Sequence, residues 1–126
     1  MKRRQLLKMA AAGAAVFPFT AFAQSTEFTF YSSLAKNWHD EGRFFSWTST
    51  TEFNNNQEVR VFYRTFGNPS NPPLLLVHGY PTSSIDFSEL IPYLQDDYFI
   101  AALDFPGFGF SDKPQNGYSY MLEDDA

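Results

Sequence analysis

Two short segments of this chain bring together the residue types of nucleophilic hydrolysis. The first contains His78, Tyr80, Ser83 and Ser84, and the second begins at Asp104. Serine, histidine and aspartate in combination can form a catalytic triad. However, a histidine at the end of a strand more often packs and shapes the following turn, and serines before a helix more often cap it. We therefore expect His78 to shape a turn, Ser83 and Ser84 to cap a helix, and Asp104 to hold the second segment through backbone N–H groups.

The first segment has the pattern of a strand, a tight turn and a helix start. Leu74–Val77 is an apolar run between prolines and Gly79, which predicts a short strand buried on both faces. Glycine permits the tight turn, and N–H groups at such a junction can point at a developing negative charge. We predict that the backbone N–H of Tyr80 is an oxyanion-hole donor, while its side chain is a buried aromatic beside the turn.

Before this strand, the sequence predicts an antiparallel hairpin. Arg43–Thr51 is rich in aromatic residues and threonine, and Val59–Phe66 begins with strict alternation. The cluster Asn54–Asn56 between them is typical of a turn.

After Gly79, the sequence predicts a helix and then a second buried strand. Ser83 and Asp86 resemble a capping box, and four apolar residues then share one helix face (Phe87, Leu90, Ile91 and Leu94). Pro92 lies inside this pattern and is expected to end or kink the helix. Tyr98–Leu103 is again apolar, so the two strands and the helix form a βαβ unit with parallel strands.

The second segment, Asp104–Asp112, is predicted to be an irregular loop beside the first turn. Gly107 and Gly109 lie in a window of five residues, and the carboxyl ends of parallel strands share one edge of a sheet. The pair of glycines lacks the third glycine and the helix of a dinucleotide-binding fingerprint. No residues have metal-ligand spacing, and we expect His39 to be a solvated loop histidine.

The two segments, LLLVHGYP and DFPGFGFSD, resemble the N-terminal half of the α/β-hydrolases. The resemblance is strongest to the branch that contains epoxide hydrolases and haloalkane dehalogenases. It implies an incomplete α/β fold in which an antiparallel hairpin leads into a parallel βαβ sheet. In that family the residue at the position of Tyr80 supplies a backbone N–H to the oxyanion hole. The peptide bond before the proline at the position of Pro81 is often cis in the epoxide hydrolase branch. The expected site-shaping residues are His78, Gly79, Pro81, Asp104, Gly107 and Gly109.

The resemblance also implies which parts of the active site lie elsewhere. The nucleophile of the family, Ser or Asp, follows a later strand, and the catalytic histidine comes later still. We therefore expect neither nucleophile nor base in this chain. The expected substrate of the whole enzyme is a small ester or epoxide, with no metal or organic cofactor. Haloalkane dehalogenases commonly have Asn where Tyr80 stands, which makes that activity less favoured. The alternative is a non-catalytic fragment or binding module, whose unpaired apolar sheet edge would favour aggregation.

The N-terminus has the pattern of an export signal. Lys2, Arg3 and Arg4 precede an apolar run that ends with Ala21–Ala23, and the two arginines resemble a twin-arginine motif. Residues 1–23 are therefore predicted to be cleaved, which leaves no stable membrane anchor and a protein in the periplasm or outside the cell. Residues 24–40 are interpreted as an N-terminal arm and residues 41–126 as a partial hydrolase domain.

The composition of the remaining chain narrows the possible partners. After residue 23 there are five basic residues against 14 acidic ones, which does not favour binding to nucleic acid. The sequence has no cysteine, so disulfides and thiolate metal sites are excluded. We expect a small-molecule substrate, and the sequence carries no indication of the oligomeric state.

Overall fold

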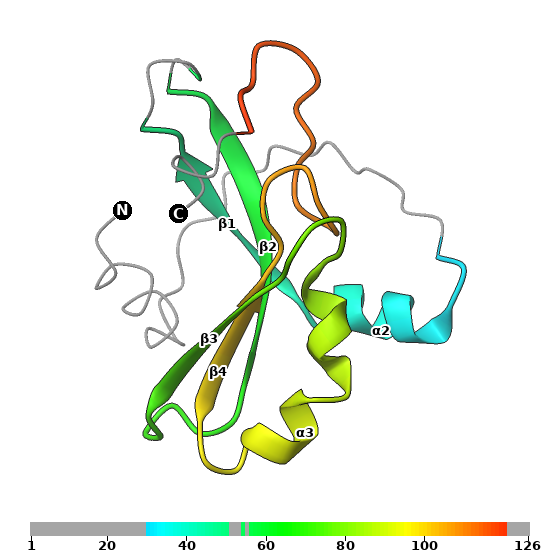
Figure 1. Ribbon diagram of the computed structural model, residues 1–126, viewed down its shortest axis with the longest axis vertical. Helices are drawn as coiled ribbons and strands as arrows, with labels where there is room; N and C mark the ends of the chain where they lie inside the picture. The colour runs from blue at the N-terminus through cyan, green and yellow to red at the C-terminus, as the bar shows by residue number, and fades with distance from the viewer. Residues whose placement is uncertain (1–29, 51–53, 55, 121–126) are drawn as a thin grey trace.

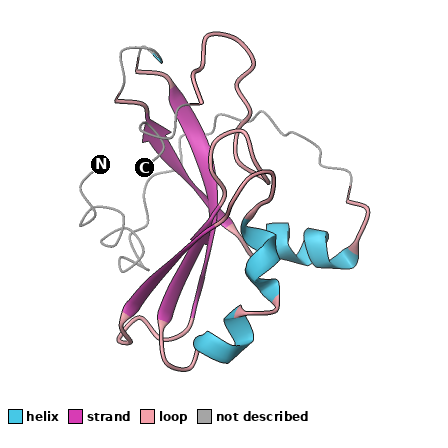
Figure 2. Cartoon of the chain, in the orientation of Figure 1, coloured by secondary structure: helices cyan, strands magenta, loops and turns pink. Residues whose placement is uncertain are grey.

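The computed structural model describes residues 30–50, 54 and 56–120, so the predicted export signal lies outside the described residues. Its centre is a four-stranded sheet with the order β1-β2-β4-β3. The strands are β1 (Arg43–Thr48), β2 (Glu58–Phe66), β3 (Pro73–Val77) and β4 (Phe99–Leu103). The helices are α2 (Ser33–Asp40), the short 3-10 helix η2 (Ser84–Ser88) and α3 (Ile91–Leu94), and they lie on one face of the sheet (Figures 1 and 2).

The strand pairing confirms the predicted hairpin and the predicted parallel pair. β1 and β2 are antiparallel, with Arg43 opposite Tyr63 and Thr48 opposite Glu58. β3 and β4 are parallel, with Val77 beside Leu103. β4 also pairs with β2 in the antiparallel direction, which makes β2 and β4 the central strands.

The burial of β3 differs from the prediction that this strand is buried on both faces. Leu74 and Leu76 pack toward the helices, but Leu75 and Val77 are 37% and 48% exposed. β3 stands at the edge of the sheet, and no described element covers its second face. An apolar run of this kind shows that both faces suit burial, but it does not show which segment supplies the cover.

The predicted single helix after Gly79 is two short pieces. η2 ends at Ser88 and α3 begins at Ile91, with Pro92 in its first turn. Proline is tolerated there because the first N–H groups of a helix have no partner within the helix, whereas the interior of one long helix would exclude it. The predicted capping box is wrong, since the side chain of Ser83 makes no capping hydrogen bond.

The segment interpreted as an N-terminal arm contains helix α2. The hydroxyl of Ser32 accepts the N–H of Ala35 at 3.1 Å and so caps its first turn. His39 is not a solvated loop residue, because it lies in the last turn of α2 and is half-buried among aromatic rings. Its imidazole stacks on Phe62 with 4° between the planes and meets Phe110 edge-on at 5.0 Å.

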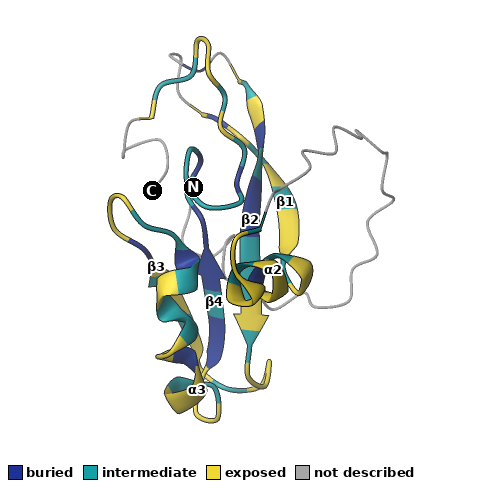
Figure 3. Cartoon of the chain, turned by 90° about the vertical axis from the view of Figure 1, so that its right-hand side faces the viewer, coloured by how far each residue is buried: buried dark blue, intermediate teal, exposed yellow. Residues whose placement is uncertain are grey.

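Buried residues concentrate on the central strands β2 and β4 (Figure 3), and they form two hydrophobic clusters. On the helix side, the buried residues are Trp38, Phe62, Ile91 and Ile100. On the other side, the buried residues are Val59, Val61 and Leu103. Among the described residues, no helix is long and apolar enough to cross a membrane.

Candidate active site

The two predicted loops meet where β3 and β4 end. The turn at His78 follows β3 directly, and the loop that starts at Asp104 follows β4. The backbone N–H of Phe105 donates a hydrogen bond of 3.0 Å to Nε2 of His78. The parallel pairing of β3 and β4 therefore brings the candidate residues of both segments to one edge of the sheet.

His78 uses both ring nitrogens inside the protein. Nε2 accepts the N–H of Phe105, so Nδ1 carries the proton and donates it to the carbonyl oxygen of Gly79 at 2.9 Å. The side chain is buried, with 7% of its residue surface exposed. In this arrangement no nitrogen of His78 is left to take a proton from a nucleophile, and the ring joins the two loops instead.

The peptide between Gly79 and Tyr80 has a defined orientation. The Gly79 oxygen accepts hydrogen bonds from three groups: Nδ1 of His78 and both the N–H and the hydroxyl of Thr82, the last two at 3.0 Å. The oxygen and the following N–H point in opposite directions across a trans peptide. The N–H of Tyr80 therefore points away from these three donors, and none of the described residues accepts it.

The side chain of Tyr80 is not the buried aromatic that we predicted. It is 88% exposed, and its ring meets the ring of Phe108 edge-on at 6.1 Å. The sequence suggested burial because aromatic residues usually pack, but the tight turn directs this ring outward. The bond between Tyr80 and Pro81 is cis.

Asp104 is fully buried and binds backbone groups of both loops. Its Oδ1 accepts the N–H of Ser84 at 2.7 Å, and its Oδ2 accepts the N–H of Phe110 at 2.8 Å. Its carbonyl oxygen accepts the hydroxyl of Ser111 at 2.7 Å, which in turn accepts the N–H of Phe62 at 2.8 Å. The carboxylate thus replaces the expected serine caps at the start of η2, and it lies against backbone rather than beside a histidine.

The two glycines of the second loop have conformations that suit glycine alone. Gly107 has φ +89° and Gly109 has φ +47°. A Cβ added at Gly109 would lie 1.9 Å from Oδ2 of Asp104. The close approach of this backbone is what lets the carboxylate reach the N–H of Phe110.

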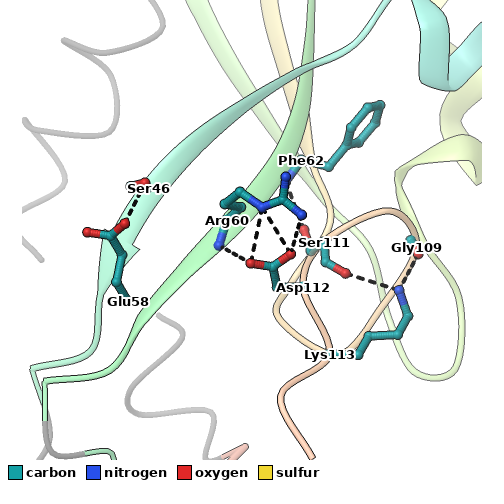
Figure 4. A network of polar contacts seen from close by, with 8 residues as sticks. All are labelled: Ser46, Glu58, Arg60, Phe62, Gly109, Ser111, Asp112 and Lys113. Carbon is teal, nitrogen blue, oxygen red and sulfur yellow. Dashed lines mark hydrogen bonds and ion pairs between the residues drawn. The ribbon is translucent and has the colours of Figure 1, made fainter. Parts of the chain in front are cut away.

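The end of this loop is tied to β2 by contacts that the sequence did not suggest (Figure 4). Arg60 donates from Nη2 to Oδ1 of Asp112 at 2.9 Å, and its backbone N–H donates to Oδ2 at 2.8 Å. Nζ of Lys113 donates to the carbonyl oxygens of Gly109 and Ser111 at 2.5 and 3.0 Å. Burial lowers the pKa of Lys113, although Asp104 and Asp112 oppose this shift. The only signal of such a contact was a charged residue, Arg60, within a β-forming run.

The described residues hold no group of three or more histidine or acidic side chains that could bind a metal ion. The arrangement can instead present one backbone N–H, from Tyr80, to a developing negative charge. Among the sequence-predicted residues, the structure joins His78 to Gly79 and brings Gly109 against Asp104, while the ring of Tyr80 meets the second loop at Phe108. Pro81 follows Tyr80 through a cis bond, and Gly107 lies in the second loop, where its N–H donates to the carbonyl oxygen of Asp112.

The sequence of this chain is similar to those of known hydrolases. The family model described as alpha/beta hydrolase fold matches residues 72–126. An uncharacterized hydrolase of Saccharomyces cerevisiae is 52% identical over 65 residues, which are 52% of this chain and 22% of that protein. The putative hydrolase LipZ of Mycobacterium tuberculosis is 39% identical over 92 residues, which are 73% of this chain and 28% of that protein.

A solved structure superposes on part of this chain. The haloalkane dehalogenase DbeA-M1 loop variant from Bradyrhizobium elkanii superposes with a TM-score of 0.52 at 26% identity, over 67% of this chain and 25% of that one. The chain therefore spans between 22% and 28% of the length of these three proteins.

Proposed function

We propose that this chain is the first portion of an exported α/β-fold hydrolase, because residues 72–126 match the model of that family. Its substrate is a small ester or epoxide, and Tyr80 supplies one N–H of the oxyanion hole. The nucleophile, Ser or Asp, and the catalytic histidine come from parts of the enzyme outside this chain. Both nucleophiles act through side chains alone, so the chemistry needs no metal or organic cofactor.

The observation that carries the proposal is the orientation of the Gly79–Tyr80 peptide. Three donors hold its carbonyl oxygen on the inner side of the turn, and the N–H faces outward at the end of β3. A donor fixed in this way loses no energy in turning toward charge that develops during the reaction. In the free protein, leaving this N–H without a protein acceptor costs little free energy, because water can bind the N–H at an exposed position.

The same N–H serves both proposed substrate classes. With a serine nucleophile, negative charge develops on the carbonyl oxygen of an ester substrate in the tetrahedral intermediate. With an aspartate nucleophile, an epoxide opens to give an ester between the substrate and the enzyme. Water then attacks that ester, and charge develops on its acyl oxygen. The donor is needed at the step in which an ester carbonyl becomes tetrahedral.

The surroundings of the N–H support an apolar substrate. The ring of Tyr80 is exposed and stands edge-on to Phe108, whose ring also meets His78 at 5.4 Å. Aromatic rings at the carboxyl ends of parallel strands provide an apolar wall for a bound molecule. No charged side chain is needed on this wall for an uncharged ester or epoxide.

The proposal is tested with two variants that separate the effect of the Tyr80 N–H from the effect of its ring. In the complete protein, Tyr80→Pro has no N–H, whereas Tyr80→Ala keeps the N–H and lacks the ring. We expect kcat for an ester or epoxide substrate to fall about 10²–10³-fold in Tyr80→Pro, the usual effect of losing one oxyanion donor. Tyr80→Ala should mainly raise KM, because it removes apolar contact with the substrate.

Circular dichroism and thermal unfolding of both variants provide the control for folding. If Tyr80→Pro folds normally and keeps the kcat of the parent protein, then Tyr80 is not an oxyanion donor.

A further inference from the structure

Helix α2 reaches the far end of the turn that carries Tyr80, through one buried side chain. We propose that Trp38 is a positioning residue for the turn from His78 to Ser84, which carries the proposed oxyanion donor Tyr80, and that it acts through Ser84. This inference rests on the proposed function of Tyr80 and adds an element that lies outside the residues matched by the family model. Figure 1 shows α2 beside the helical segment that begins at Ser84.

The contact between the two residues is direct and buried. Nε1 of Trp38 donates a hydrogen bond of 3.2 Å to Oγ of Ser84, across 46 positions of sequence. Trp38 is 4% exposed and Ser84 is 0% exposed. A buried indole N–H requires an acceptor, and a buried group that loses its partner is costly. The bond therefore specifies where Ser84 lies relative to α2.

Trp38 is itself held against the sheet. The guanidinium of Arg64 on β2 lies 4.4 Å from its ring, and the ring of Phe66 lies 5.6 Å away. Arg64 also forms an ion pair with Glu41, the residue that follows α2. Because β2 is a central strand, Trp38 connects the rigid middle of the sheet to the start of η2.

The turn is consequently anchored at both ends. At its first end, His78 joins Phe105 and holds the Gly79 oxygen. At its second end, the N–H of Ser84 binds Asp104, and the hydroxyl of Ser84 binds Trp38. Between these anchors, residues 79 to 81 are exposed, and the Gly79 oxygen is held by His78 and Thr82. Loosening either anchor allows the Tyr80 N–H to move, and small displacements of a catalytic donor reduce the rate.

The test uses three variants of the complete protein: Trp38→Phe, Ser84→Ala and the double variant. Each single change deletes one side of the hydrogen bond. We expect kcat to fall about fivefold in each, the size that corresponds to one net hydrogen bond, with KM nearly unchanged. The double variant should be no slower than the slower single variant, because both changes break the same bond.

The matched control is Trp47→Phe, the same chemical change at the other tryptophan of the chain. Trp47 is half-buried on β1 and packs against the cluster on the opposite side of the sheet. We expect this variant to lose stability without a specific loss of kcat.

A second measurement reports on the turn itself and does not require activity. The amides of Thr82 and Ser84 are hydrogen-bonded, to Gly79 and Asp104 respectively. Their hydrogen exchange should become faster in Trp38→Phe and stay unchanged in Trp47→Phe.

The outcomes separate this inference from the proposed function. Equal effects of Trp38→Phe and Trp47→Phe on exchange and on kcat would overturn the inference, as would faster exchange with an unchanged kcat. If the parent protein hydrolyses neither esters nor epoxides, the proposed function fails, and the exchange measurement alone decides whether Trp38 restrains the turn.

Discussion

At Gly109, a single hydrogen in place of a side chain makes room for the most buried carboxylate of the site. Its φ of +47° is unfavourable for other residues, and a Cβ would lie 1.9 Å from Oδ2 of Asp104. Gly117 has a similar conformation, with φ +72°, but among the described residues no atom beyond its chain neighbours lies within 4 Å of its Cβ position. The two positions therefore separate the cost of backbone strain from the cost of displacing Asp104.

At this scale we predict that Gly109→Ala destabilises the complete protein more than Gly117→Ala does. The second variant should lower the free energy of unfolding by about 1 kcal/mol, from backbone strain alone. The first should lower it by roughly 3 kcal/mol, because it also breaks the buried contacts of Asp104. Urea unfolding measures both values. Equal losses would show that Asp104 moves aside without cost.

Among the elements, β3 differs most from its expected surroundings. Its residues alternate between a face that packs on the helices and a face with Leu75 and Val77 exposed. It is also an edge strand, so its outer backbone groups have no described neighbour in the sheet. Edges with exposed apolar side chains favour association between chains.

We predict that a segment of residues 24–126, produced alone, associates through β3. Val77→Lys should increase its monomeric fraction in size-exclusion chromatography without lowering its melting temperature, because the new charge lies on the exposed face. Leu76→Lys is the matched change on the face toward the helices, and it should lower the melting temperature. A segment that is already monomeric before substitution would contradict this prediction.

For the whole molecule, the proposal of an exported enzyme has two parts, which are catalysis and export. The chain spans about a quarter of the length of the three proteins compared above. We therefore propose that catalysis belongs to a longer protein. Export is assigned to residues 1–23, which lie outside the described part of the structure. These two proposals are independent, since a leader peptide is removed before the enzyme acts.

We predict that bacterial expression yields an exported protein whose first residue is Gln24. Mass spectrometry of the exported material measures this, and a protein that still begins with Met1 would count against cleavage. Replacing Arg3 and Arg4 by lysine keeps the charge and removes the twin-arginine motif. Export should then stop, whereas continued export would indicate an ordinary secretory signal.

The parts predictable from the sequence follow from local chemistry. Aromatic and β-forming runs indicated β1 and β2, and continuous apolar runs indicated β3 and β4. Polar turn residues indicated the hairpin between β1 and β2. The parallel pairing of β3 and β4 then required their loops to meet, which places the turn at His78 beside the loop that begins at Asp104. The glycines at 107 and 109 signalled an irregular loop, because few other residues adopt its conformations.

The tertiary structure decided the features that depend on distant partners. Helix α2 escaped prediction because its stability comes from packing Trp38 against β2 and η2, and a helix of eight residues has little local signal. Ser84 was expected to cap a helix, but a carboxylate 20 positions away binds its N–H instead. The sequence by itself determined which strands and turns form, because those preferences act between neighbouring residues. Only the folded structure decided which groups face each other across the loops, because burial and hydrogen bonding act between residues far apart in the chain.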